Sequence, residues 1–163
     1  SETDDQSSSS DMKHILLLSL SVLLVSNLQA KDTPKPRPYK GSGIEVSNIQ
    51  NTEKCQTSFQ TGVATHWGNW TGVAEACLID ETHPLYLFEI DALYTVANGD
   101  TIVMQGEWEF DESTGTAFGT FDFHPGTGRF DEASGTGVWG GTYTMDKDGN
   151  LVFNMWSEGV IVY

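Results

Sequence analysis

The stretch DESTGTAFGTFDFHPGTGRFDEASGTGVWGG, residues 111–141, contains one turn-forming sequence twice. Residues 111–116 read DESTGT, and residues 131–136 read DEASGT twenty positions later. An alternation of apolar and small residues follows each copy, over residues 117–121 and 138–143. A turn followed by an alternating strand, repeated at this period, predicts an antiparallel meander.

The same alternation extends in both directions from the repeat. It predicts strands at residues 55–66, 70–79, 85–97, 101–110, 116–123, 137–145 and 151–163. Asn98-Gly99 is the strongest hairpin signal, and Trp67-Gly68-Asn69 and Asp148-Gly149 are further expected turns. No helical period occurs after residue 30. The predicted fold is therefore all-β, a single antiparallel up-and-down barrel of about eight strands of the calycin-like kind, with a β-sandwich as the alternative.

The N-terminal part divides into three segments. Residues 12–30, MKHILLLSLSVLLVSNLQA, have the charged start, apolar run and small final residue of a bacterial signal peptide, which predicts a secreted or periplasmic protein. Residues 1–11 are Ser-rich and acidic, and we interpret them as a disordered extension or tag. Residues 31–54 are expected to be a Pro-rich basic leader and linker holding at most one short strand, and residues 55–163 the barrel domain.

Charge excludes some partners. The chain has 8 basic and 23 acidic side chains, a net charge of −15, and from residue 55 onward only Arg129 and Lys147 are basic. Such a body repels nucleic acid and anionic membrane surfaces. We expect no nucleic-acid partner and no stable membrane insertion once the signal peptide is removed. The oligomeric state is left open.

The chain contains two cysteines, Cys55 and Cys77. Export to an oxidising compartment favours a bond between them, and a hairpin turning near Gly68 would bring them to one rung. The alternative is two buried free thiols. No Cys-x-x-Cys motif is present to indicate a redox or catalytic role.

Three segments resemble a known superfamily. Residues 126–135, GTGRFDEASG, resemble the GTGxFxxAxG segment of allene oxide cyclases and dirigent proteins. Residues 64–68, ATHWG, and 97–100, ANGD, are similar to motifs of uncharacterised secreted bacterial proteins with an allene oxide cyclase-like barrel. The matches occur in the same order and span most of the predicted barrel. The resemblance implies an eight-stranded barrel whose interior can hold a small apolar molecule.

Three functions follow from these observations. The first is binding of a small apolar or aromatic molecule in the lumen. The second, implied by the resemblance, is a cyclase or isomerase, although the catalytic polar residues of the plant enzymes have no counterpart that we can match here. The third is a non-catalytic envelope or surface protein that acts through its exterior or its basic leader. Binding without catalysis is favoured, and no cofactor is expected.

The chain is rich in aromatic side chains that alternation places on the inner face. Those not needed for packing would line a cavity for an apolar or aromatic ligand. The candidate ligand-binding residues are Tyr86, Phe88, Met104, Trp108, Phe121 and Trp139. His66 is the first catalytic suspect, as a general base at the barrel mouth, and its alternative is a hydrogen-bonded turn histidine.

Other patterns are assigned structural roles. Gly126, Gly128 and Phe130 are expected to form a tight turn, since no helix follows to make a phosphate loop. The carboxylates of Glu89, Asp91, Glu107 and Glu109 are expected on a solvated outer face. No His-x-His or His-x-x-x-His pair exists, so no metal site is predicted.

Overall fold

The computed structural model describes residues 33–47 and 54–163. In it, every strand pairs with the strands that precede and follow it in the chain. The predicted extension and signal peptide lie outside the described residues. The elements are β1 (Pro36–Ser47), β2 (Cys55–Ala64), β3 (Gly68–Thr82), β4 (Leu85–Val96), β5 (Thr101–Asp111), β6 (Thr116–His124), the 3₁₀ turn η1 (Gly128–Phe130), β7 (Ser134–Met145) and β8 (Leu151–Val162).

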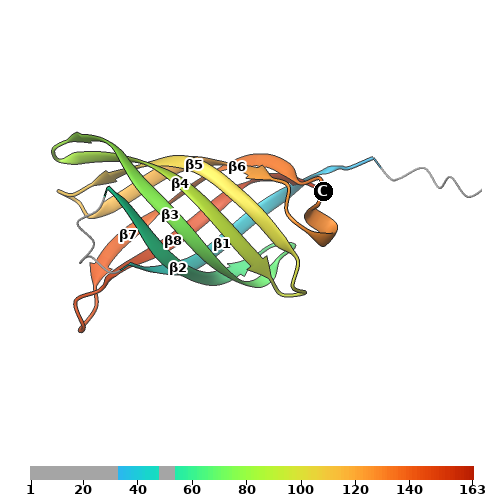
Figure 1. Ribbon diagram of the computed structural model, residues 1–163, viewed down its shortest axis with the longest axis horizontal. Coiled ribbons are helices and arrows are strands. Elements are labelled where there is room, and N and C mark those ends of the chain that lie inside the picture. Colours follow the sequence, from blue (N-terminus) through green and yellow to red (C-terminus); the bar gives the residue numbers. More distant parts are fainter. Residues whose placement is uncertain (1–32, 48–53) are drawn as a thin grey trace, which may run out of the picture. The chain divides into compact units, whose positions relative to one another are not determined.

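The eight strands form one closed antiparallel up-and-down barrel, in which β1 pairs with β8 (Figure 1). The predicted fold class is confirmed, and the β-sandwich alternative is wrong. The two copies of the repeat lead into β6 and β7, as the meander required, although they lie at opposite ends of the barrel. Closure leaves no free sheet edge along the paired strands.

The first strand differs from the sequence prediction. Residues 36–40, expected in a solvated leader, are the start of β1 and pair with β8 from Pro36↔Val162 onward. Pairing of β1 with β2 begins only at Gly41, and the carbonyl of Lys40 still accepts a hydrogen bond from the Thr65 N–H at 2.8 Å. Even-numbered backbone groups of β1 therefore face the β2 side. Pro36 and Pro38 lie where that side has no partner strand, so their missing N–H groups cost no ladder bond.

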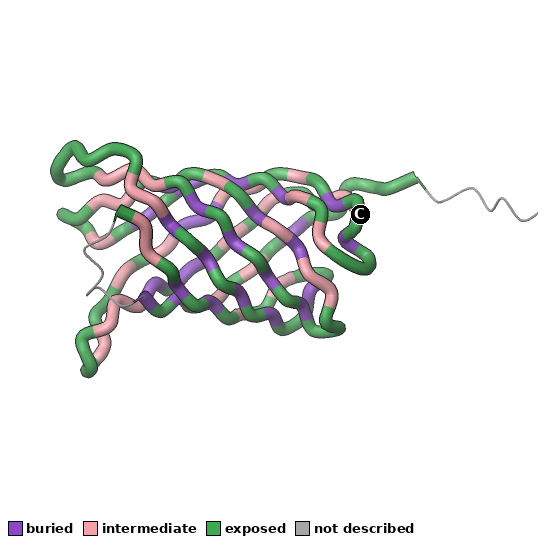
Figure 2. The backbone as a smooth tube through the Cα atoms, viewed as in Figure 1, coloured by how far each residue is buried: buried purple, intermediate pink, exposed green. Residues whose placement is uncertain are grey.

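Buried and exposed residues alternate along the tilted strands (Figure 2), because successive side chains point alternately to the lumen and to the outer surface. On β3 the inward Trp70 reaches over the neighbouring strands: a Cβ on Gly43 or Gly62 would lie 2.8 Å or 2.5 Å from its ring. Bare backbone at these two positions is what lets an indole fill this part of the lumen. On β4 and β5, Glu89, Asp91 and Glu107 face outward and are exposed, as predicted.

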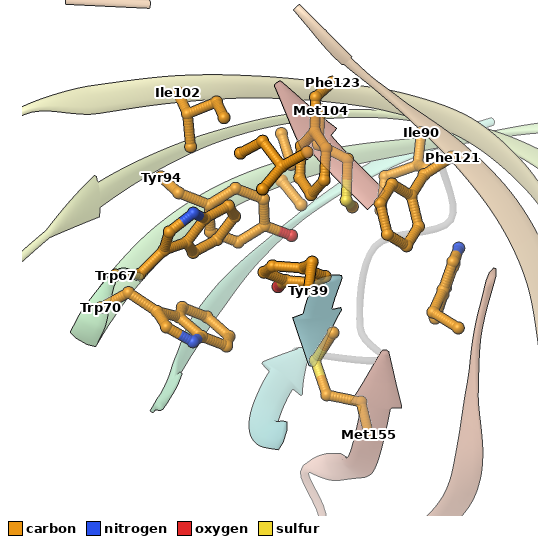
Figure 3. Packing of buried hydrophobic residues seen from close by; sticks show 14 of the residues in the cluster. Tyr39, Trp67, Trp70, Ile90, Tyr94, Ile102, Met104, Phe121, Phe123 and Met155 are labelled. Atoms are coloured by element: carbon orange, nitrogen blue, oxygen red, sulfur yellow. The ribbon is translucent and has the colours of Figure 1, made fainter. Parts of the chain in front are cut away.

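Aromatic rings close one end of the barrel, called here the Trp67 end. Trp67 is only 2% exposed. The turn was expected at residues 67–69, but it forms at residues 65–67, and β3 begins at Gly68. The Trp67 ring centroid lies 5.0 Å from that of Tyr39, 5.5 Å from Tyr94 and 5.6 Å from Phe123 (Figure 3). Phe130 of η1 is fully buried against the same ring. These contacts seal the Trp67 end.

The opposite end, called the Cys55 end, begins with the disulfide. Cys55 and Cys77 are bonded, with Cα atoms 4.0 Å apart on directly opposed positions of β2 and β3, which confirms the predicted bridge. At this end the inward side chains of Tyr86, Phe88, Phe110 and Tyr143, on β4, β5 and β7, are half-buried, whereas Ser47, Ser58 and Phe153 are buried. Solvent therefore reaches farther into the lumen here than at the Trp67 end.

Candidate functional site

A carboxyl group lies inside the barrel. Glu45 on β1 points into the lumen and is 6% exposed, although it lies only two residues before the strand ends at Ser47. In the strand register it lies opposite Gln60 of β2 on one side and Phe153 of β8 on the other. Strand geometry alone thus places this carboxyl between a polar and an aromatic neighbour.

Neutral groups hold the carboxyl in place. Gln60 Nε2 donates to Glu45 Oε2 at 2.6 Å, and Ser47 Oγ donates to Glu45 Oε1 at 3.0 Å. The hydroxyl of Tyr94 donates to Gln60 Oε1 at 2.7 Å, which fixes the orientation of the amide. The result is a buried hydrogen-bonded chain from Tyr94 through Gln60 to Glu45 and Ser47, called here the Glu45 chain.

The electrostatic environment of Glu45 favours its protonated form. Burial raises the pKa of this carboxyl above its ordinary value, and hydrogen bonds from Ser47, Gln60 and Ser58 offset only part of the effect. Among the described residues no lysine, arginine or histidine forms an ion pair with it. A buried acid without a cation is costly to keep, and such perturbed groups concentrate at functional sites.

Aromatic rings form the facing wall at the Cys55 end. Phe88 and Trp108 stack with centroids 4.5 Å apart, and Tyr143 stacks on Phe153 at 4.4 Å. Trp108 and Tyr143 join these pairs at 5.9 Å. Phe88 and Tyr143 remain half-buried. The mouth at the Cys55 end therefore has a stacked aromatic wall on β4, β5, β7 and β8, and a polar wall carrying Glu45 on β1 and β2.

The half of the lumen nearer the Trp67 end is packed. A cavity of about 10 Å³ lies among Tyr39, Trp67, Trp70, Tyr94, Met104, Trp139, Met155 and Ser157. This volume has room for about one water molecule, whereas ligand sites measure hundreds of Å³. Four buried indole N–H groups have no hydrogen-bond acceptor in the described structure, those of Trp67, Trp70, Trp108 and Trp139. This half of the lumen therefore has no room for an organic ligand.

The six candidate ligand-binding residues are divided among four places. Phe88, Trp108 and Trp139 lie together, with the Trp108 and Trp139 centroids 5.7 Å apart. Met104 lines the small cavity, and Phe121 packs in the cluster at the Trp67 end. The hydroxyl of Tyr86 donates to Glu112 at 3.1 Å on the outer rim. Phe88 and Trp108 belong to the aromatic wall at the Cys55 end, whereas Trp139 also lines the small cavity.

His66 lies outside the lumen. Its ring is exposed at the Trp67 end, and Nε2 lies 3.0 Å from the carbonyl oxygen of Pro38. Its backbone has φ of 69°, and its own carbonyl accepts a hydrogen bond from the Arg129 guanidinium. These contacts match the turn-histidine alternative. The suspicion that His66 is the catalytic group inside the barrel is not supported by its position.

The segments behind the family resemblance meet at the Trp67 end. Ala97 N–H donates to the Trp67 carbonyl at 3.2 Å, and Arg129 N–H donates to Asp100 Oδ2 at 3.2 Å. Gly128 has φ of 60°, and a Cβ there would lie 2.0 Å from the Asp100 carboxylate, so the expected turn requires glycine. Residues 64–68, 97–100 and 126–135 thus close the barrel, far along the strands from the Glu45 end of β1.

One group of potential metal ligands occurs in the described part of the chain. Glu75, Cys55 and Cys77 approach one another, but the disulfide uses both sulfur atoms, which therefore offer no thiolate. Within residues 33–47 and 54–163 the histidines form no cluster with carboxylates beyond the exposed pair of His83 and Glu112, with Nδ1 and Oε2 3.1 Å apart. Nothing in this arrangement resembles a metal centre.

Sequence reasoning missed Glu45, Ser47, Ser58 and Gln60. Residues 31–54 were expected to be a leader and linker, but Pro36–Ser47 form β1, whose Ile44 and Val46 are 42% and 38% exposed on the outer surface. The available signal was the polar alternation itself, Glu45-x-Ser47 and Ser58-x-Gln60, on two strands expected to pair. A period of two states which residues share a face, but not which face is inside.

The comparisons with known proteins leave the site unassigned: no protein-family model matches the chain, and no curated protein matches it significantly. The described residues include no helix long and apolar enough to cross a membrane.

Proposed function

We propose that the barrel binds a small neutral molecule at the Cys55 end of its lumen. The ligand has an apolar or aromatic body, which packs on the Phe88–Trp108 wall, and one hydroxyl-like group, which hydrogen-bonds to the Glu45 chain. The observation that carries the proposal is Glu45 itself, a buried carboxyl held only by neutral donors opposite a half-buried aromatic wall.

The properties of the site support this ligand class. A protonated carboxyl both donates and accepts, so it pairs with a hydroxyl or carbonyl without importing charge. A carboxylate ligand would meet an acidic chain of net charge −15 and a carboxyl whose pKa burial already raises. Stacked rings 4.5 Å apart offer a flat apolar surface to an aromatic or aliphatic ligand.

The first experiment is native mass spectrometry of residues 31–163, before and after extraction with organic solvent. A defined small mass that disappears on extraction supports the proposal. The extracted protein is then titrated with 4-propylphenol and with propylbenzene, which differ by one hydroxyl. We expect the phenol to bind about three- to tenfold more tightly, the value of one hydrogen bond.

Variants of Glu45 test the role of the carboxyl. Glu45→Leu should abolish the preference for the phenol, whereas Glu45→Gln should keep it, because an amide still donates and accepts. Glu89→Gln on the outer face is the matched control and should behave as the unmodified chain. The proposal fails if neither probe binds, or if Glu45→Leu retains the full preference.

Membership of the allene oxide cyclase-like superfamily and export from the cell belong to this proposal. The closed eight-stranded barrel supports the first, because it is the fold that the resemblance implies. The Cys55–Cys77 bond supports the second, since disulfides persist in oxidising compartments.

A cyclase or isomerase is the second candidate, favoured by the raised pKa of Glu45 and its link through Gln60 to Tyr94, which suit a proton transfer. Such an enzyme would return its ligand at unchanged mass but with a different chromatographic retention. Glu45→Gln would then bind the ligand and return it unaltered. Identical retention from both proteins would leave binding alone.

A further inference from the structure

An apolar row crosses the outer surface of four adjacent strands. Val46 of β1 lies opposite Phe59 of β2, Phe59 opposite Val73 of β3, and Val73 opposite Leu93 of β4. These four side chains, called here the apolar row, are 38%, 68%, 47% and 51% exposed. Consecutive register positions bring them side by side, so they form one continuous stripe rather than scattered surface residues.

Strand β2, at the centre of the row, carries no charge, and the nearest carboxylates are those of Glu75 and Asp91, two residues along β3 and β4 from Val73 and Leu93. The ten residues of β2, CQTSFQTGVA, include no ionisable side chain other than the bonded Cys55, in a chain of net charge −15. Ile44, 42% exposed, lies two residues from Val46 on β1, and Val63, 53% exposed, lies beyond Thr61 on β2. The exposed carboxylates Glu89, Glu107 and Glu109 are on β4 and β5, away from β1 and β2.

The exposed area fits a protein interface. The apolar row with Ile44 and Val63 presents on the order of 500 Å² of apolar surface, at the upper end for a monomer. A standard interface takes about 800 Å² from each partner, of which somewhat more than half is apolar. The row therefore supplies the apolar part of one complete standard interface.

We infer that the apolar row is the interface of a two-fold symmetric homodimer, a property that does not depend on the proposed lumen ligand. The residues on either side of the apolar row favour a second copy as the partner. Thr61, Thr71 and Thr95 are aligned on one side of the apolar row, and Glu75 and Asp91 on the other.

A two-fold axis along the apolar row places each flank of one protomer against the opposite flank of its partner. Glu75 and Asp91 then face the threonine hydroxyls of the other copy, which can donate to them, and not its carboxylates. Glu75 and Asp91 flank the apolar row on one side only, and the two-fold arrangement gives each of them a hydrogen-bond donor from the second copy.

Sedimentation velocity of residues 31–163, which contain all eight strands, tests the inference. We expect a dimer that dissociates on dilution and tightens as salt is added, because salt screens the repulsion between two acidic protomers. Phe59→Glu should weaken the dimer about 100-fold or more, because symmetry removes the ring from both sides and adds two charges. Met145→Glu, at a side chain that is 65% exposed at the end of β7, is the control and should leave the dimer intact.

Cross-linking tests the orientation independently. The axis along the row brings Phe59 of each protomer near its symmetry mate, so Phe59→Cys should form a disulfide-linked dimer on oxidation, and Met145→Cys should not. A wild-type chain that stays monomeric up to about 100 μM, well above the range of specific dimers, overturns the inference. So does a Phe59→Glu variant, folded by circular dichroism, that retains the wild-type dissociation constant.

Discussion

Loss of the Cys55–Cys77 bond should destabilise the barrel by a calculable amount. The bond joins opposed positions of β2 and β3 that are 22 residues apart in sequence. Without it the folded hairpin keeps its register, whereas the unfolded chain gains the freedom that the closed loop had removed. The loop-entropy relation for this separation gives about 3 kcal/mol at 25 °C.

The expected change is large enough to measure directly. For a barrel of about this size, 3 kcal/mol corresponds to a fall in Tm of roughly 10 °C. The test compares residues 31–163 with the Cys55→Ser/Cys77→Ser double variant, by urea and thermal denaturation followed by far-UV circular dichroism. Wild-type protein with added reductant serves as the second comparison and should reproduce the double variant.

Two results would refute the reasoning. A loss below about 1 kcal/mol would mean that the unfolded chain is already compact around this hairpin, so that the bond restricts it little. A stable wild type and a double variant that does not fold would mean that the bridge is needed for native strand pairing at the Cys55 end.

The remaining predictions concern Glu45 and the turn at Gly128. Because the pKa of Glu45 is raised in the folded state, its contribution to stability is full below the ordinary carboxyl pKa and is lost as pH rises through the raised pKa. The unfolding free energy of the wild type minus that of Glu45→Gln, measured in urea at each pH, isolates this loss. A difference that does not change with pH would contradict the prediction. Gly128→Ala should cost about 2 kcal/mol or more, because it adds a Cβ clash with Asp100 to an unfavourable φ. Gly99→Ala, at φ of 88° with nothing within 4 Å of the added Cβ, should cost about 1 kcal/mol. Equal losses in Tm for the two variants would rule out the clash.

The sequence predicted the β4–β8 part of the barrel well because local signals and burial agree there. Asn98-Gly99 forms its turn, with Gly99 at φ of 88°. Acidic and apolar residues alternate on β4 and β5, so a carboxylate at Glu89 or Glu107 marks the outside unambiguously. Where charged residues alternate with apolar residues along a strand, the alternation also shows which face of the strand lies inside the barrel.

The same reasoning located β2 but assigned no inner face to β1 or β2, where the signals conflict. The lumen side carries glycine, serine, glutamine and Glu45, whereas Phe59 and Val46 face outward. The lumen there is filled by Trp70, which extends from β3 over the neighbouring strands β2 and β1, so these strands need little bulk of their own. This filling depends on which strands are neighbours in the closed barrel, and a short stretch of sequence does not contain that information. The Glu45 chain was missed for this reason.

Closure of the barrel also determines when the molecule can finish folding. The pairing of β1 with β8 joins Pro36 to Val162, 126 positions apart, and no shorter segment can replace it. A chain emerging from the ribosome can form hairpins such as β2–β3 early, but β1 keeps an unpaired edge until the last strand is synthesised. Contacts at this separation make folding slow. The nascent protein therefore remains an open sheet, able to pair with neighbouring chains, until synthesis is almost complete.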